Sequence, residues 1–141
     1  SELREKDSFQ RGNLHIHLLP FMPQDDYDRL LWCCELNLVR GEDSFVRAQW
    51  AGRPLLWHIY AQEEGAHWLK LEAFLALYQQ ALPAPAQAAL KAFWYAWNAQ
   101  EDLAGPWVQV QQQWDALQNH AESWCNQQAA RPDLAARLAL L

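Results

Sequence analysis

One stretch decides the fold of this 141-residue chain: Leu36-Asn37-Leu38-Val39-Arg40-Gly41-Glu42-Asp43-Ser44. Its first four residues form a short, largely apolar run, which indicates a buried strand. Arg40-Gly41 ends that run, and the residues after it predict a helix with Asp43 or Ser44 as its N-cap and Gly52 at its end. The stretch therefore predicts a strand, a tight loop and a helix.

The segments on both sides repeat this order. Residues 14–19 alternate apolar and polar side chains, as a strand does, and Pro23-Gln24-Asp25-Asp26 starts a helix with acidic residues near its positive end. Residues 55–60 are a third strand by their β-branched and aromatic content. Strands separated by helices predict an α/β fold with a parallel sheet and right-handed crossovers.

After residue 65 the pattern is helical only. Apolar residues recur at helical spacing up to Leu82, and the later prolines suit the first turns of new helices. These prolines are Pro85, Pro106 and Pro132, and the last helix is expected to end at Leu141. We therefore expect a short parallel sheet with a long helical tail.

Composition limits the size, partners and location of the protein. With 51% hydrophobic residues the chain can bury one core, so we expect one domain over residues 14–141 after a lead-in loop at residues 1–13. A net charge of −6 with only 11 Lys and Arg residues argues against nucleic acid. No apolar run approaches the roughly 20 residues that cross a bilayer, and the start shows no export signal. We expect no membrane partner and a cytoplasmic location.

Residues 40–44 carry the chemistry. Ligands of parallel α/β sheets bind beyond the carboxyl ends of the strands, where Gly41 allows close approach and the N–H groups near Asp43 and Ser44 can hold a diphosphate. Two carboxylates facing a phosphate would repel it, so we expect at least one of Glu42 and Asp43 to accept a hydrogen bond from a ribose or sugar hydroxyl. The alternative is a helix-capping box beside a solvated Arg40.

The preceding strand leads to a second candidate group, Phe21, Gln24 and Tyr27. Two aromatic rings flanking an amide can stack on a nucleobase and bind its edge. The alternative is that these aromatic residues pack in the core.

Several runs resemble the C-terminal half of the EarP family of protein-arginine rhamnosyltransferases. They are residues 21–24, residues 38–52, residues 54–60 and residues 70–75. The resemblance extends from about Leu14 onward and departs from the family at Met22, Tyr27 and Ala61, where Val, Phe and Pro are expected. It implies the Rossmann-like C-terminal half of a GT-B glycosyltransferase that needs no metal. It also implies dTDP-β-L-rhamnose as donor, an arginine of bacterial elongation factor P as acceptor, and inversion at the sugar carbon.

The resemblance also implies roles for individual residues. Phe21, Gln24 and Tyr27 are expected to surround the thymine, and Glu42 to meet the ribose. Arg40, Asp43 and Ser44 are expected around the diphosphate and the sugar. Together these are the nucleotide-sugar-binding residues that we predict.

The N-terminal half of the family, with its carboxylates that act on the acceptor arginine, has no counterpart in this sequence. A guanidinium has a pKa above 12 and needs a positioned base before it can attack, so no catalytic residue is assigned here. We expect the chain to be a fragment of a larger two-domain enzyme and to be unable to transfer rhamnose alone.

Other readings stay open. His15 and His17 lie on one predicted strand, but no third ligand follows at a metal-binding spacing, so no metal site is predicted. The chain could also be a non-catalytic helical interaction module, in which Trp94, Trp97, Trp107 and Trp114 would leave an exposed apolar patch. A third reading is a donor-binding half for another nucleotide sugar, such as a UDP-hexose.

Overall fold

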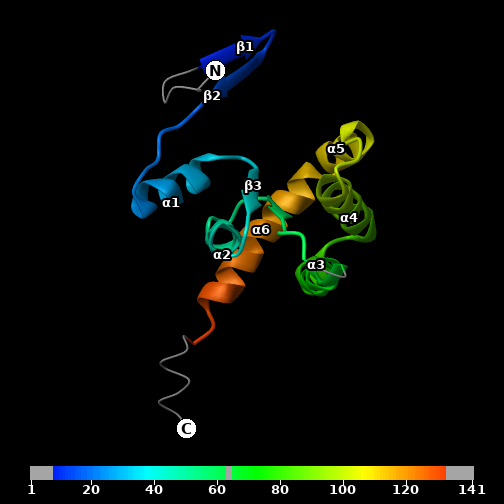
Figure 1. The fold of residues 1–141 in the computed structure, drawn as a ribbon. Coiled ribbons are helices and arrows are strands. Elements are labelled where there is room, and N and C mark those ends of the chain that lie inside the picture. The colour runs from blue at the N-terminus through cyan, green and yellow to red at the C-terminus, as the bar shows by residue number, and fades with distance from the viewer. Residues whose placement is uncertain (1–7, 63–64, 133–141) are drawn as a thin grey trace.

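The computed structural model describes residues 8–62 and 65–132. Two pairs of strands are followed by a group of helices (Figure 1). In chain order the elements are β1 (Ser8–Arg11), β2 (Leu14–His17), α1 (Gln24–Cys33), β3 (Asn37–Arg40), α2 (Asp43–Trp50), β4 (Leu55–His58), α3 (Ala66–Tyr78), the 3-10 helix η2 (Gln79–Ala81), α4 (Ala84–Ala99), α5 (Ala104–Gln112) and α6 (Trp114–Ala129). The predicted helix after Pro132 lies outside the described residues.

The strand predicted at residues 14–19 forms as β2, but it does not join the parallel sheet. It pairs antiparallel with β1, with Phe9 opposite Ile16, and the two strands are connected by Gly12-Asn13. Gly12 has a φ of 60°, the left-handed conformation that such a two-residue turn requires. The prediction of three parallel strands is therefore wrong, as is the prediction of a loop at residues 8–11. The hairpin projects away from the helices (Figure 1).

The parallel sheet consists of β3 and β4, which are joined by α2. Val39 lies opposite Trp57, and Arg40 lies opposite His58. The predicted order of strand, loop and helix is thus confirmed, together with an α/β class that has a short parallel sheet and many helices. α2 ends close to the predicted glycine, since Gly52 turns the chain with a φ of 62°.

Helix α4 closes the edge of β4 that faces away from β3. The Asn98 side chain accepts a hydrogen bond from the Ile59 N–H at 3.0 Å and donates one to the Trp57 carbonyl at 2.9 Å. The Trp94 indole N–H donates to the Leu55 carbonyl at 3.1 Å. Buried peptide groups need partners, and here side chains supply them in place of a further strand. The sheet therefore ends at β4.

The outer edge of β3 is open. Parallel pairing directs every second peptide group toward β4, as the Asn37 and Gly41 N–H groups show by donating to β4 or the residue before it. The peptide groups of Leu38 and Arg40 therefore face the other way, where no described strand pairs with them. The Leu38 side chain is 46% exposed although both its neighbours in the chain are buried.

Aromatic side chains fill the core between the sheet and the helices. Phe45 of α2 stacks on Trp57 of β4 with ring centroids 4.0 Å apart, and Phe74 of α3 meets both rings edge-on. Tyr78 and Trp124 continue this contact into α6. Packing thus explains seven of the nine tryptophans, because rings from separate helices interlock around the short sheet, whereas Trp32 and Trp50 are half-exposed.

The four tryptophans that an interaction module would expose are inside the fold. Trp94 is fully buried, and the other three are partly buried and pack against the core. The helical stripe that contains Trp107 and Trp114 is split between α5 and α6 by Gln113, whose φ of −110° and ψ of 15° interrupt the helix. Within residues 8–62 and 65–132, no helix has both the length and the apolar content to cross a membrane.

We predict that Asn98→Ala destabilises the fold by about 2–4 kcal/mol, because it leaves buried peptide groups of β4 without partners. Urea unfolding followed by circular dichroism measures the change. Asn119→Ala is the control, since Asn119 is exposed on α6, and the free energy of unfolding should change there by less than about 0.5 kcal/mol. Equal effects of the two substitutions would show that side chains of α4 do not hold this edge.

Candidate functional site

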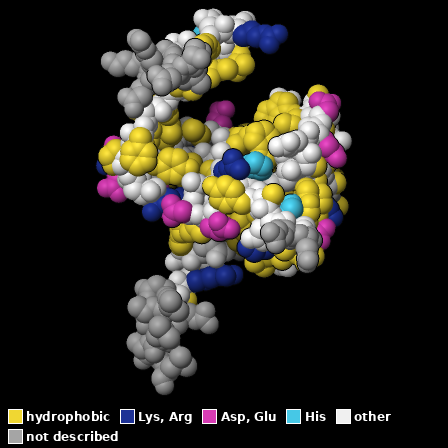
Figure 2. Space-filling view, in the orientation of Figure 1, with side chains coloured by type: hydrophobic (Ala, Val, Ile, Leu, Met, Phe, Trp, Pro, Cys, Tyr) yellow, Lys and Arg dark blue, Asp and Glu magenta, His cyan; other side chains and the backbone are white. Residues whose placement is uncertain are grey.

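A cavity of about 600 Å³ lies between the segment that leads into α1 and the start of α2. It stands just beyond the carboxyl end of β3, where parallel α/β sheets bind ligands. Figure 2 shows hydrophobic side chains gathered over α1 and the segment before it. The cavity is lined by five of the residues predicted to bind a nucleotide sugar: Phe21, Gln24, Tyr27, Asp43 and Ser44.

The aromatic end of the cavity is shaped by the residues around Pro23. Phe21 is 100% exposed, so its ring makes no packing contact with the core. Tyr27 lies one turn into α1, where its N–H donates to the Pro23 carbonyl at 3.1 Å and its side chain packs against the edge of the core. Gln24, the first residue of α1, lies between them in the chain. Core packing thus accounts for Tyr27 in part and for Phe21 not at all.

The opposite end of the cavity is the start of α2, which no side chain caps. Glu42 occupies the N-cap position in a helical conformation, with φ of −88° and ψ of −45°, and makes no side-chain cap hydrogen bond. The capping-box alternative is therefore wrong. The amides of the first helical turn, from Asp43 to Phe45, have no acceptor among the described residues. Together with the helix dipole, they form a site that suits an anion.

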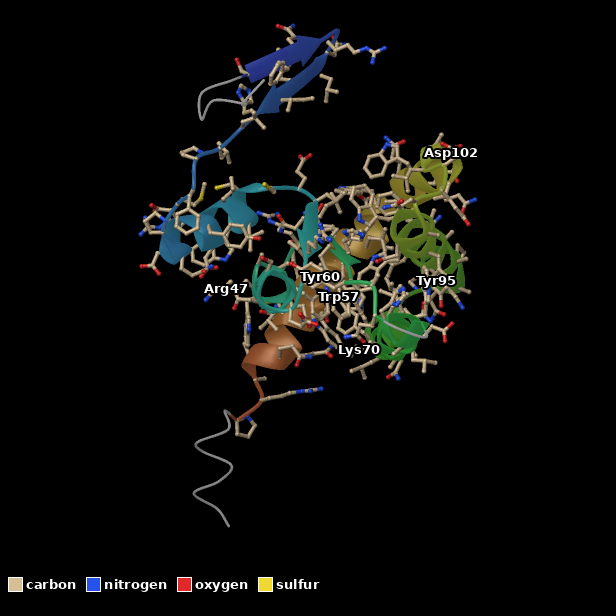
Figure 3. The ribbon with its side chains drawn as sticks, in the orientation of Figure 1. Arg47, Trp57, Tyr60, Lys70, Tyr95 and Asp102 are labelled. Carbon is tan, nitrogen blue, oxygen red and sulfur yellow. The ribbon has the colours of Figure 1, made fainter. Side chains whose placement is uncertain are left out.

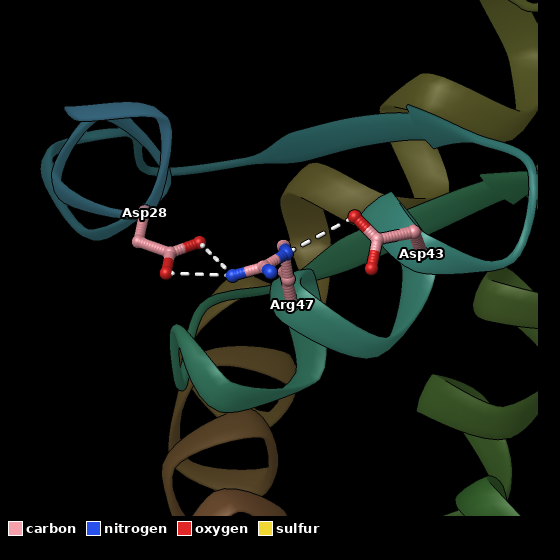
Figure 4. A network of polar contacts seen from close by, with 3 residues as sticks. All are labelled: Asp28, Asp43 and Arg47. Atoms are coloured by element: carbon pink, nitrogen blue, oxygen red, sulfur yellow. Dashed lines mark hydrogen bonds and ion pairs between the residues drawn. The ribbon is translucent and has the colours of Figure 1, made fainter. Parts of the chain in front are cut away.

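Arg47 ties the two walls of the cavity together (Figure 4). Its Nη1 donates to both carboxylate oxygens of Asp28 on α1, at 2.9 and 3.1 Å, and its Nε donates to Asp43 at 3.0 Å. The hydrogen bond with Asp43 is the main cause that raises the pKa of Arg47; desolvation opposes it and Asp28 adds to it. This bridge fixes α1 relative to α2, and so fixes the distance between the aromatic end and the anion end.

The bridge also separates the roles of the two neighbouring carboxylates. Asp43 shares its charge with Arg47, so it repels a bound anion less than a free carboxylate would. Glu42 is exposed, and no described residue pairs with it. Glu42 is therefore the carboxylate that can accept a hydrogen bond from a ligand hydroxyl.

Arg40 and Glu42 do not line the cavity, although both were predicted to bind the same ligand. Arg40 is exposed beside it and lies over the ring of Tyr60, with the guanidinium carbon 4.8 Å from the ring centroid. Tyr60 also packs on Gly41, where a Cβ atom would lie 2.8 Å from its Cε2. Trp57 and Tyr60, both labelled in Figure 3, thus each contact Gly41.

Sequence reasoning missed Asp28, Arg47 and Tyr60. The spacing of Asp43 and Arg47, four residues apart on one helix, could have revealed their ion pair. Tyr60 comes shortly after the carboxyl end of β4, and Arg40 lies at the carboxyl end of β3. Because parallel strands end on the same side of a sheet, this could have indicated that the two residues are neighbours. In residues 8–62 and 65–132, no three His, Cys, Asp or Glu side chains are grouped in a way that could hold a metal ion.

Comparisons with known proteins show which family this chain resembles. The family described as "Elongation-Factor P (EF-P) rhamnosyltransferase EarP" matches residues 1–141. A protein-arginine rhamnosyltransferase of Pseudomonas aeruginosa is 61% identical over 132 residues, which are 94% of this chain and 35% of the relative. A protein of the same name from Shewanella oneidensis is 43% identical over 129 residues, covering 90% of this chain and 33% of the relative. The chain spans about a third of the length of these curated relatives.

A solved structure has the same fold. It is described as "Structural basis for EarP-mediated arginine glycosylation of translation elongation factor EF-P" and is similar with a TM-score of 0.88 and 51% sequence identity. The similarity covers 99% of this chain and 44% of that chain. Sequence profile, curated relatives and fold agree, and the chain belongs to the EarP family.

Proposed function

We propose that this chain is the donor-binding part of a GT-B glycosyltransferase that transfers rhamnose from dTDP-β-L-rhamnose to an arginine of elongation factor P. The observation that carries the proposal is the cavity that brings Phe21, Gln24 and Tyr27 to the uncapped start of α2, in a chain of the EarP family. Family membership supports the reaction, and the cavity supports the donor.

The dimensions and chemistry of the cavity suit a nucleoside diphosphate. A volume of about 600 Å³ lies within the range of small-molecule sites, roughly 300–1,000 Å³. The thymine stacks against Phe21 and Tyr27 and meets the amide of Gln24. The diphosphate lies at the first-turn amides of α2 with the Ser44 hydroxyl, and Arg40 reaches it from beside the cavity.

Glu42 does not line the cavity, and like Arg40 it reaches the ligand from beside it. In this arrangement it accepts a hydrogen bond from a hydroxyl of the nucleoside's deoxyribose, because no described residue pairs with its carboxylate. The β3, α2 and β4 unit, with its ligand at the carboxyl end of β3, suits the Rossmann-like half of a GT-B enzyme. The resemblance to the family implies a reaction without a metal cofactor. The proposed acceptor is a translation factor, which supports a cytoplasmic location for the reaction.

The acceptor chemistry requires more than this site supplies. An arginine guanidinium is charged at neutral pH and is a poor nucleophile until a carboxylate orients it and takes its proton. Asp43 is engaged with Arg47, and Glu42 is assigned to the donor, so neither is proposed as that base. We place the base in the part of the relatives' length that this chain does not span.

Calorimetric titration of the chain with nucleotides tests donor recognition. We predict that dTDP and dTDP-rhamnose bind about three- to tenfold more tightly than dUDP, which lacks only the thymine methyl group and its roughly 1 kcal/mol of apolar burial. UDP and a UDP-hexose, which carry a 2′-hydroxyl as well, should also bind more weakly than dTDP. Chelation of divalent cations should leave these affinities unchanged. Preference for a UDP-sugar would reassign the donor. Absence of binding to every nucleotide would reject the donor site in this chain and favour the interaction module.

The aromatic end can be tested with a pair of matched substitutions. Phe21→Ala should weaken dTDP binding about tenfold or more through lost stacking, which is worth roughly 1–3 kcal/mol per base. Its melting temperature should stay unchanged because Phe21 is fully exposed. Trp32→Ala, which removes a half-exposed ring at the other end of α1, should leave the affinity as it is. Equal dTDP affinities of the two variants would show that the thymine does not stack on Phe21.

Incubation with elongation factor P and dTDP-rhamnose tests whether this chain acts alone. We predict that intact-mass spectrometry finds no added deoxyhexose on the acceptor, because the proposed site holds the donor but supplies no base for the arginine. The Pseudomonas aeruginosa relative is the positive control. A modified arginine produced by this chain unaided would contradict the proposed division of labour.

A further inference from the structure

The carbonyl of Gly41, in the middle of the loop at residues 40–44, is bound by a buried tryptophan. Trp57 of β4 is 5% exposed and is held by its stack on Phe45 and its edge contact with Phe74. Its indole N–H donates to the Gly41 carbonyl at 2.8 Å. This indole is therefore a rigid donor presented to a loop that otherwise lies at the surface.

Gly41 is anchored to β4 on both sides. Its N–H donates to the His58 carbonyl at 3.3 Å, while its carbonyl accepts from Trp57. The φ of 79° is a left-handed conformation, and the Tyr60 ring leaves no room for a Cβ atom. The turn between Arg40 and Glu42 is thus set by residues 57–60.

The hydrogen bond from Trp57 also sets the direction of the next amide. The Gly41–Glu42 peptide is trans, so its N–H points opposite to its C=O. Because Trp57 holds this carbonyl toward the core, the Glu42 N–H points outward, and it has no acceptor among the described residues. It precedes the open amides of α2 in the chain and lies beside the anion end of the cavity, although Glu42 is not part of its lining.

We propose that Trp57 is a positioning residue for the donor: its indole N–H holds the loop at residues 40–44 so that the Glu42 amide and the start of α2 face the diphosphate. This inference rests on the proposed function. Trp57 does not line the cavity; its indole N–H reaches the loop through Gly41, and its ring also stacks on Phe45 in the first turn of α2. Its loss should therefore affect recognition of the diphosphate and spare recognition of the nucleoside.

Trp94 provides a matched control. It is 0% exposed, and its indole N–H donates to a backbone carbonyl at 3.1 Å, that of Leu55 in the same strand. That bond lies at the closed edge of β4, opposite the edge that pairs with β3, and it contacts no residue of the loop. Trp57→Phe and Trp94→Phe each remove one buried N–H donor and keep an aromatic ring.

The experiment compares dTDP and thymidine binding to the two variants by NMR titration. For Trp57→Phe we expect about a five- to tenfold loss of dTDP affinity, as one hydrogen bond of roughly 1 kcal/mol would give, and an unchanged thymidine affinity. Trp94→Phe should keep both affinities, while its melting temperature falls about as much as that of Trp57→Phe. Wild-type affinity for dTDP in Trp57→Phe, or an equal loss in Trp94→Phe, would overturn the proposal.

Two further measurements separate this inference from the proposed function and from misfolding. In the ligand-free chain, hydrogen exchange at the Glu42 amide and the shifts of Gly41 should change in Trp57→Phe and not in Trp94→Phe. This readout judges the loop anchor even if the wild-type chain binds no nucleotide, which would reject the donor site instead. 3-Benzothienylalanine at position 57 keeps the shape of the indole without its N–H. It should reproduce the Trp57→Phe result, and wild-type behaviour would count against the hydrogen bond.

Discussion

Strand β4 is hydrogen-bonded along both of its edges, to β3 on one side and to side chains of α4 on the other. A two-stranded sheet is marginal by itself, because few of its peptide groups are paired and few of its side chains are covered. Asn98 and Trp94 bind the peptide groups of β4 that a further strand would otherwise pair with. The aromatic rings around Trp57 cover the side chains of the sheet. Of the tail helices, α4 contacts this strand directly and α3 reaches it through Phe74, while α5 and α6 pack on α4 and α2.

The site depends on the same strand. β4 determines the turn at Gly41 through Trp57, His58 and Tyr60, and α2 starts directly after that turn. The aromatic wall is joined to this end by the ion pairs of Arg47 with Asp28 and Asp43, and by the packing of Leu31 and Tyr27 against the core. Core packing and surface electrostatics thus both hold the two ends of the cavity in place, and Asp43 belongs to the bridge as well as to the anion end.

Local features of the fold were predictable from the sequence, and pairings across the chain were not. The strand and helix at residues 36–50 follow from short-range patterns of apolar residues and glycine. Residues 14–17 do form a strand, but a period of two says nothing about its partner, so the hairpin with Ser8–Arg11 was missed. A polar lead-in that ends in Gly12-Asn13 fits a loop and a hairpin turn equally well.

The same limit applies to the site. Phe21, Gln24, Tyr27, Asp43 and Ser44 could be grouped because they follow or begin neighbouring elements. The contacts of Asp28 with Arg47 and of Trp57 with Gly41 join residues 19 and 16 positions apart, and no local spacing marks them.

The two edges of the parallel sheet differ in whether they can pair with another strand. The outer edge of β4 is occupied by side chains of α4, whereas the peptide groups of Leu38 and Arg40 on β3 have no strand partner among the described residues, and the Leu38 side chain is exposed. An uncovered strand edge is a template for any extended segment, including the same edge of another copy. An extended segment that pairs with β3 would cover this edge, whereas an uncovered edge favours association between copies at high concentration.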